Sequence, residues 1–561
     1  RKEEKHNIYQ LLLSNLTRTP IFSKYFPDSF YKISNIIYEE EIMKRLVSIL
    51  TTLSVIISAS LADVIEVSGT ITENTTWTSD NEYLLVGQTF VDSGVVLTIE
   101  PGTVIKANSD DGTGLAPCLV ITRGAKIIAD GTKEHPITFT SSLPEDELPQ
   151  RGTWGGLIIL GNAPTNQGES FVEGLIGVPY GGNNPDDSSG VLRYVRVWYG
   201  GAVIGQDNEI NGITFAGVGR KTVVEHCEVA WNLDDGFEFF GGTVNVRYLS
   251  AIFCGDDAFD TDEGYQGKGQ FLFTIMGQDM CGRGFEMDND GNNMDNQPRS
   301  FPQFANVTLI GPGGGNPAND GADEMIRLRE GTAGDFRNIL IVDGNGYGLR
   351  VKDDITISLI GDSLKFSPNS IIYNCLLGQF HPDVSSLLNA REIDPVLRSL
   401  EGRESDTGII DPRPQAGSPA FQNVDELPDD GFFEQTDFIG AFGEELWLKG
   451  WSWLDEAGRL PDETTIDIED EIPALDFRII RVYPNPFNPI ANIQFEVKKT
   501  THVKGEIIDL SGRIVKELFN REFTPGIYNE KIRADNLSSG IYIIRMTNGN
   551  NNTYQKMSII K

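Results

Sequence analysis

The stretch WNLDDGFEFFGG (Trp231–Gly242) returns 22 residues later as FCGDDAFDTDEG (Phe253–Gly264), with a similar order of acidic, aromatic and glycine residues. The shift carries Phe237 to Phe259. Each unit holds short apolar runs separated by Gly, Asp or Asn, a pattern typical of β-strands and tight turns. A unit this short cannot bury its apolar face alone, whereas stacked copies bury it continuously. The repeat therefore predicts a right-handed parallel β-helix.

The same 22-residue shift relates two earlier segments, LTIEPGTVIKA from Leu97 and LVITRGAKIIA from Leu119, and places Ile105 level with Ile127. Later units keep the pattern with longer loops. Three of them put an asparagine at one phase: Asn306, Asn338 and Asn374. Because an amide both donates and accepts hydrogen bonds, we expect these side chains to form an internal ladder.

A further strand position changes its charge along the predicted stack. Its successive occupants are GFEF, AFDT, GFEM, MIRL and YGLR. The first three segments carry a carboxylate and the last two carry an arginine. We therefore expect this column of strands to run from acidic to basic.

Composition excludes one class of function. The chain has 561 residues, 46 Lys and Arg against 81 Asp and Glu, and a formal charge of −35. Proteins that bind nucleic acid need a cationic surface, so we expect no nucleic-acid partner and look to cations instead. The five cysteines show neither a CxxC pair nor zinc-like spacing.

A targeting signal lies inside the chain. From Met43 the sequence reads MKRLVSILTTLSVIISASLA, with two basic residues, a short apolar run and small residues before Asp63. This predicts a signal peptide cleaved after Ala62; a retained anchor is the alternative, although the apolar run is shorter than the roughly 20 residues that span a bilayer. Residues 1–42 then precede the true start as a translation artefact, or form a helical extension. We expect no transmembrane segment in the mature chain.

The C-terminal stretch alternates apolar and polar residues around Pro and Gly turns, which predicts a small β-sandwich of about 80 residues. It resembles the type A sorting domain of type IX secretion, whose fold is similar to an Ig-like domain. The residues that carry the resemblance are Tyr483, Pro484, Asn485, Pro486, Gly512 and Gly540. The resemblance implies Sec export, the type IX secretion machinery as a partner, and a place outside the cell or on the outer-membrane surface of a diderm bacterium. An accessory sandwich without a sorting role is the alternative.

The repeat region also resembles a known family. GTWGGLIILGNAP, GVLRYVRVWYGG and LDDGFEFFGG are similar to motifs of secreted bacterial right-handed β-helix proteins, over about residues 64–450. That family implies no established activity. The expected fold is all-β, a parallel β-helix followed by a small Ig-like β-sandwich. The predicted layout is an upstream extension (1–42), a signal peptide (43–62), the β-helix (63–410), a cap and acidic linker (411–476) and the sorting domain (477–561).

Two side-chain clusters leave alternatives open. Trp447, Trp451 and Trp453 could form a platform for sugar rings, or could cap the open end of the solenoid, which is the interpretation we favour. Cys254 and Cys281 each precede a glycine at the expected turn of neighbouring coils. They could form a disulfide, while five buried thiols are the alternative.

The repeated acidic doublet is the main candidate site. Stacked strands lie about 4.8 Å apart, so carboxylates at one phase repel one another unless they reach solvent, take up protons, pair with Arg or share a hard cation. Calcium fits an extracellular setting. Turn formation by Asp and Gly, and catalysis, are the other interpretations. The candidate metal ligands are Asp234, Asp235, Glu238, Asp256, Asp257, Asp260, Glu286 and Asp288.

Two classes of function remain. One is a non-catalytic adhesin or glycan-binding scaffold on the cell surface, which we favour. The other is a calcium-dependent polysaccharide lyase or hydrolase acting on an extracellular polysaccharide, with a basic residue as catalytic base. The residues at suitable phases are Lys268, Arg283, Arg327 and Arg329. Fold class alone does not decide between the two.

If the signal peptide is real, the exported protein begins with DVIEVSG, at Asp63. N-terminal sequencing of protein recovered from the medium or the cell surface checks this. Mature protein that still carries residues 1–42 would contradict both the cleavage site and the internal start.

Overall fold

The computed structural model describes residues 64–109, 115–172, 175, 177–205, 208–313, 323–400, 403, 408–462, 477–483, 489–508, 513–534, 537–548 and 552–559. The predicted signal peptide (43–62) and the upstream extension (1–42) lie outside these residues. The chain divides into two units, Arg1–Pro461 and Asp462–Lys561, each described here by itself.

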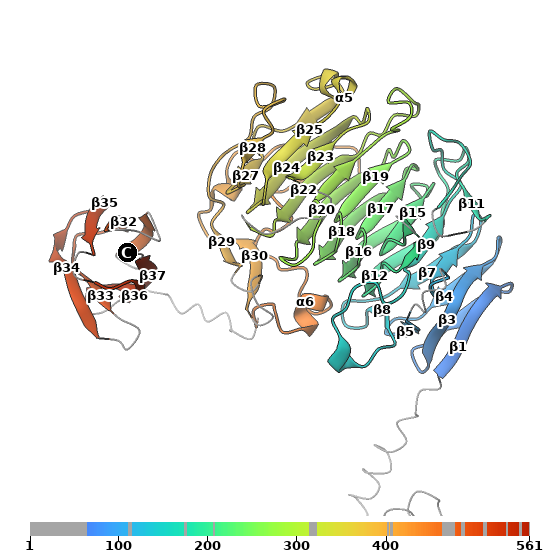
Figure 1. The fold of residues 1–561 in the computed structure, drawn as a ribbon, viewed down its shortest axis with the longest axis horizontal. Helices are drawn as coiled ribbons and strands as arrows, with labels where there is room; N and C mark the ends of the chain where they lie inside the picture. Colours follow the sequence, from blue (N-terminus) through green and yellow to red (C-terminus); the bar gives the residue numbers. More distant parts are fainter. Residues whose placement is uncertain are drawn as a thin grey trace, which may run out of the picture. The chain divides into compact units, whose positions relative to one another are not determined.

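The first unit winds through three columns of parallel strands (Figure 1). The first column consists of β2 (Thr75–Trp77), β4 (Val96–Ile99), β7 (Lys126–Asp130), the first halves of β12 (Gly190–Trp198), β16 (Val223–Ala230), β18 (Asn245–Ile252), β20 (Lys268–Ile275), β22 (Gln303–Ile310) and β24 (Gly334–Val342), and β26 (Leu364–Phe366). The second column consists of the first halves of β1 (Val64–Ile71) and β3 (Glu82–Val91), then β5 (Val104–Ala107), β8 (Ile137–Ser141), the second halves of β12 to β24 just named, and β27 (Ile371–Tyr373).

The third column consists of the second halves of β1 and β3, then β6 (Leu119–Ile121), β9 (Leu157–Leu160), β15 (Ile213–Ala216), β17 (Phe237–Phe240), β19 (Phe259–Asp262), β21 (Phe285–Met287), β23 (Glu324–Leu328), β25 (Tyr347–Val351) and β28 (Gly378–Phe380). Loops hold the short pairs β10 (Ser170–Phe171) with β11 (Pro179–Tyr180) and β13 (Val203–Gly205) with β14 (Asn208–Glu209), the 3-10 turn η1 (Glu145–Glu147) and the helix α5 (Asp354–Ser358). The predicted all-β parallel β-helix is confirmed.

The 22-residue period is the true register only in part of the stack. β17 pairs with β19 so that Phe237 lies opposite Phe259, as the repeat predicts. The match of Leu97 with Leu119 is wrong, because Leu97 pairs with Thr75 and Ile127. Strands of all three columns share one alternating pattern, so a sequence comparison can align strands of different columns.

A corner between the first and second columns bends each long strand through a left-handed residue. These residues have φ between 49° and 60°: Tyr194, His226, Tyr248, Phe271, Asn306 and Asn338. The four rings stack in turn, with centroids 4.5, 4.4 and 4.6 Å apart. The result is an aromatic stripe along the side of the solenoid.

The expected asparagine ladder is wrong. Asn306 donates to the carbonyls of Phe438 (2.9 Å) and Gly440 (3.2 Å), and Asn338 donates to the carbonyl of Asp425. Both amides are therefore used by a later segment of the chain, not by one another. Asn374 lies at a different corner and donates to Asp343, since it follows the second column.

That later segment, residues 410–460, is here called the cover segment. It includes β30 (Ile410–Pro414), which pairs with β29 (Leu397–Leu400), the 3-10 turn η4 (Pro419–Phe421) and the short helix α6 (Trp453–Glu456). Trp451 is 1% exposed and packs edge-on against Tyr194 and His226. Trp447 packs in the same way against Tyr248.

The tryptophans therefore cover the flank of the solenoid, and the prediction that they cap its open end is wrong. The physical reason is the aromatic stripe, which leaves a long apolar surface beside the middle coils that must be removed from water. Because Trp447 and Trp451 are buried, their faces are not available as a sugar platform.

The five cysteines are free thiols, so the Cys254–Cys281 disulfide is not formed. The reason is register. The offset to the next coil is 23 residues at Ile252 and 26 at Phe259, while the two cysteines are 27 apart in sequence, so neither strand pairing brings them level.

The second unit holds two antiparallel sheets around one apolar core. One sheet contains β31 (Phe477–Tyr483), β32 (Ile490–Val497) and β35 (Gly526–Arg533). The other contains β33 (Thr501–Ile508), β34 (Ile514–Phe523), β36 (Gly540–Thr547) and β37 (Asn552–Ile559). Its Ig-like topology stays a prediction. Tyr483 ends β31 and Gly540 begins β36, while Pro484, Asn485, Pro486 and Gly512 lie outside the described residues.

Within the described part of the chain, no helix is long and apolar enough to cross a membrane.

Glu228 ties the cover segment to the solenoid. Its buried carboxylate accepts hydrogen bonds from the indole of Trp198 (3.0 Å), the hydroxyl of Ser250 (3.0 Å) and the backbone N–H of Trp453 (2.6 Å). Burial nevertheless raises the pKa of Glu228 to about 7. The protonated form is thus favoured by folding.

We expect Glu228→Gln to remove a pH-dependent loss of stability. The folded-state pKa lies above that of an unfolded glutamate, so the parent protein loses stability as the pH rises from about 4.5 to about 7. At pH 8 the variant should be more stable by about 3 kcal/mol, and at pH 4 equal to the parent. Denaturant unfolding at both pH values measures this; a difference independent of pH would contradict it.

Candidate functional site

The third column presents a row of charged side chains on its outer side. β17 alternates buried Phe237 and Phe239 with outward Glu238. The strand pairings place one outward position of each coil level with the next: Thr214, Glu238, Asp260, Glu286, Arg327 and Arg350. The predicted change from acidic to basic along the stack is confirmed by this register.

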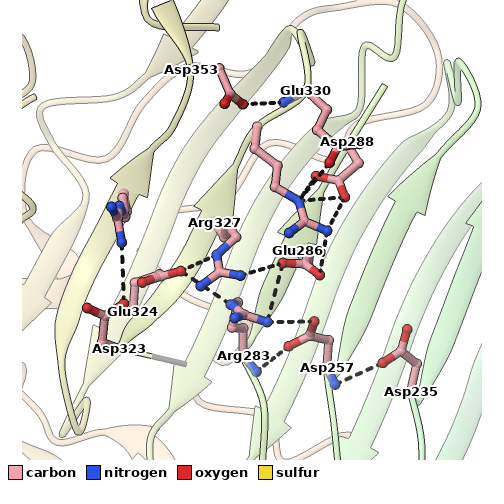
Figure 2. A network of polar contacts seen from close by, with 12 residues as sticks. Asp235, Asp257, Arg283, Glu286, Asp288, Asp323, Glu324, Arg327, Glu330 and Asp353 are labelled. Atoms are coloured by element: carbon pink, nitrogen blue, oxygen red, sulfur yellow. Dashed lines mark hydrogen bonds and ion pairs between the residues drawn. The ribbon is translucent and has the colours of Figure 1, made fainter. Parts of the chain in front are cut away.

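The second aspartate of each doublet holds the next coil. Oδ1 of Asp235 accepts a hydrogen bond from the backbone N–H of Asp257 at 2.9 Å. Oδ1 of Asp257 in turn accepts from the backbone N–H of Arg283 (Figure 2). Both carboxylates are buried, with Asp235 7% and Asp257 3% exposed. The doublet is therefore part of the scaffold, as the turn interpretation requires.

The carboxylates also converge in a way that turn formation does not need. In each of three groups, one ligand oxygen per residue lies within 4.8 Å of the others: Asp234 with Asp235 and Asp256, Asp235 with Glu238 and Asp260, and Asp257 with Asp260 and Glu286. The structure thus brings together seven of the eight predicted ligands. Asp288 stands apart from these groups and pairs with Arg329 at 2.8 Å.

The carboxylates of these groups repel one another. Burial, and then the charges of neighbouring carboxylates, hold the pKa values of Asp235 and Asp260 well above their usual range. The pKa of Asp257 is raised for the same reasons. Oδ1 of Asp260 is buried and, among the described residues, has no hydrogen-bond partner. A proton or a cation would relieve this repulsion.

Farther along the stack, arginines neutralise the row (Figure 2). Arg283 is buried and lies 3.3 Å from each of Asp257, Glu286 and Glu324. Arg327 joins Glu324 to Glu286, and Arg329 joins Glu286 to Asp288. Removing one member would leave a buried charge unpaired, which would destabilise the folded protein.

The basic residues named as candidate bases are all ion-paired. Burial disfavours the charged form of Arg283, but its three carboxylates outweigh burial and raise its pKa, so the guanidinium stays protonated. Lys268 begins β20 in the first column and pairs with Asp430 at 2.5 Å. The prediction that Lys268 lies at a phase suitable for a catalytic base beside the acidic row is therefore wrong, because Lys268 lies on another face of the coil.

Sequence reasoning missed two carboxylates: Glu324, a member of the arginine network, and Asp262, which lies on the acidic strand β19 but outside the three carboxylate groups. Glu324 stands three residues before Arg327, as Arg283 stands three before Glu286, so extending the repeat by one coil would have found it. Asp262 lies two residues beyond Asp260 on β19, and burial raises its pKa to about 8. The sequence of β19 alternates buried residues with acidic ones, so the position of Asp262 could have been predicted from that pattern.

Comparison with known proteins agrees with both units. The pectate-lyase-like beta helix domain matches residues 69–379, more than half of the chain, and the secretion system C-terminal sorting domain matches residues 481–561. The sorting domain marks the chain as a secreted or cell-surface protein recognised by type IX secretion. No curated protein matches.

Two solved structures are distant likenesses. One is the enzymatically active domain of tailspike protein 2 of bacteriophage CBA120, with 10% identity, a TM-score of 0.24, and 89% of this chain and 76% of that chain covered. The other is the full-length tailspike protein 2 from an Escherichia coli O157:H7 bacteriophage, with 9% identity, a TM-score of 0.24, and 89% and 68% covered. At these TM-scores neither bears on activity. By its three columns of parallel strands and by the match over residues 69–379, the chain belongs to the family of pectate-lyase-like β-helix proteins.

Proposed function

We propose that this protein is a non-catalytic glycan-binding or adhesive scaffold, held on the outer-membrane surface of a diderm bacterium or released from it, with calcium bound on its third column. The sorting domain supports the location. The three carboxylate groups, which share Asp235 and Asp260, support the binding of calcium. An extracellular polysaccharide is the proposed partner, because a cation held by protein oxygens can also take oxygen ligands from sugar hydroxyls and carboxylates.

One observation carries the cation site. Asp260 belongs to two of the three carboxylate groups, and its buried Oδ1 lacks a hydrogen-bond donor among the described residues. The donor set is entirely oxygen, which suits a hard cation such as calcium. Two oxygens on opposite sides of calcium, each about 2.4 Å from it, are about 4.8 Å apart, so the groups have the right size.

If calcium binds there, it stabilises the folded protein. At free calcium a hundredfold above its dissociation constant, the free energy of unfolding should rise by about 2.7 kcal/mol. Asp260→Asn should abolish this increment, and should itself stabilise the calcium-free protein by relieving repulsion. Thermal unfolding at fixed ionic strength, with and without calcium, measures both effects.

The matched control is Asp262→Asn, on the same strand and outside the three groups. This variant should keep the calcium increment. If calcium does not change the melting temperature of the parent protein, the calcium proposal is wrong and the acidic doublets have a structural role only.

A polysaccharide lyase or hydrolase is the second candidate, favoured by one observation, the position of Arg283 beside three carboxylates. Arg283 is buried and fully ion-paired, which supports the non-catalytic proposal instead. Incubating the purified protein with acidic glycans and calcium separates the two. We expect the glycans to bind without new reducing ends or unsaturated uronate; the appearance of either product assigns an enzyme.

A further inference from the structure

A pocket of about 470 Å³ opens between the aromatic stripe and the cover segment. The pocket lies on another part of the coil than the acidic row. The acidic row belongs to the third column, whereas the floor of the pocket is the corner between the first and second columns. Tyr248 and Phe271 form that floor. The other lining residues all come from the cover segment: Glu434, Gln435, Thr436, Asp437, Phe438, Ala441, Gly443, Glu444, Glu445 and Trp447.

The rim is strongly acidic. Four carboxylates line the pocket, and no lysine or arginine is among its lining residues. Arg247 pairs with Glu434 at 2.9 Å and offsets one of the four charges. Asp437, Glu444 and Glu445 are exposed. A concave surface with this excess of negative charge attracts a cation.

The aromatic walls restrict what can enter. Tyr248 is stacked on both faces, by His226 and by Phe271, and Trp447 is stacked between Phe442 and Trp451. Neither ring has a free face on which a pyranose could lie. The pocket instead offers ring edges and the Tyr248 side chain, which suits a slim alkyl chain.

The phenol adds a polar group at the same point. Burial, together with the charges of Glu434 and Glu445, raises the pKa of Tyr248 to about 12. The hydroxyl therefore stays protonated. Tyr248 lines the pocket together with the carboxylates, so an ammonium group there would have both phenol and carboxylate oxygens as hydrogen-bond acceptors.

We propose that this pocket binds an alkylammonium group, with the charged end among Glu434, Glu444 and Glu445 and the methylene chain against Phe271 and Phe438. Such a group could come from a free polyamine or from the lysine side chain of a partner protein. This site goes beyond glycan or calcium binding, and its failure would leave that proposal untouched.

Titration calorimetry of the secreted chain with n-butylammonium tests the pocket. n-Butanol supplies the same chain without the charge, and sodium supplies charge without the chain, so butylammonium should bind more tightly than either. Glu444→Gln combined with Glu445→Gln should weaken binding about tenfold, because charge-assisted hydrogen bonds are lost. Putrescine represents a free polyamine, and Nα-acetyl-lysine amide represents the lysine side chain of a protein. The compound that binds more tightly identifies the source.

Glu426→Gln is the matched control, an exposed glutamate of the cover segment outside the pocket. Combined with Asp429→Asn, a second exposed carboxylate outside the pocket, it removes the same charge as the double variant and should leave the affinity unchanged. Circular dichroism confirms folding of all variants. Equal affinity for butanol and butylammonium, an equal loss in the control, or no detectable binding would each overturn the proposal.

Discussion

Parallel in-register hydrogen bonding between successive coils is the constraint on which the rest of this structure depends. It sets each residue about 4.8 Å from its counterpart in the next coil, whatever the two side chains are. Apolar residues gain from this, as in the stack of Phe237 on Phe259 at 5.4 Å. Carboxylates are forced together by the same geometry, because the backbone fixes the spacing before the charges can separate.

The chain resolves that repulsion differently along one column. At the phase of Asp235 and Asp257, the next coil carries Arg283, and the sign of the charge inverts without any change in backbone pairing. Beyond that point Arg327 and Arg329 balance the carboxylates. Before it, burial and the neighbouring carboxylates hold the pKa values of Asp235 and Asp260 well above their usual range. The change from carboxylates paired with one another to carboxylates paired with arginine therefore falls within one sheet, where Arg283 follows Asp257 in the next coil.

Much of the fold could be predicted from the sequence because local alternation and the doublet repeat are short-range signals. The pairing of Phe237 with Phe259 follows from them, and so does the acidic-to-basic row. Register elsewhere could not be predicted, because insertions in loops change the coil length without altering the strand pattern, which misplaced Cys254. Leu97 was misplaced because strands of different columns share one alternating pattern.

The partners of the corner residues could not be predicted either. Asn306 and Trp451 bond or pack to segments over a hundred residues away, and no local pattern reports such contacts. The same limit applied to Arg283, which pairs with Glu324, 41 residues later in the chain.

The bond from Arg196 to the carbonyl of Trp451 closes a chain segment of 255 residues. Coils can add one after another through near neighbours, whereas the cover segment must wait until distant coils exist, so folding ends with a step of high contact order. Until then the stacked rings of Tyr194 to Phe271 face water. During this time the nascent chain exposes an apolar surface that can aggregate. The docking of the cover segment, the last step in folding of the first unit, removes that surface from water.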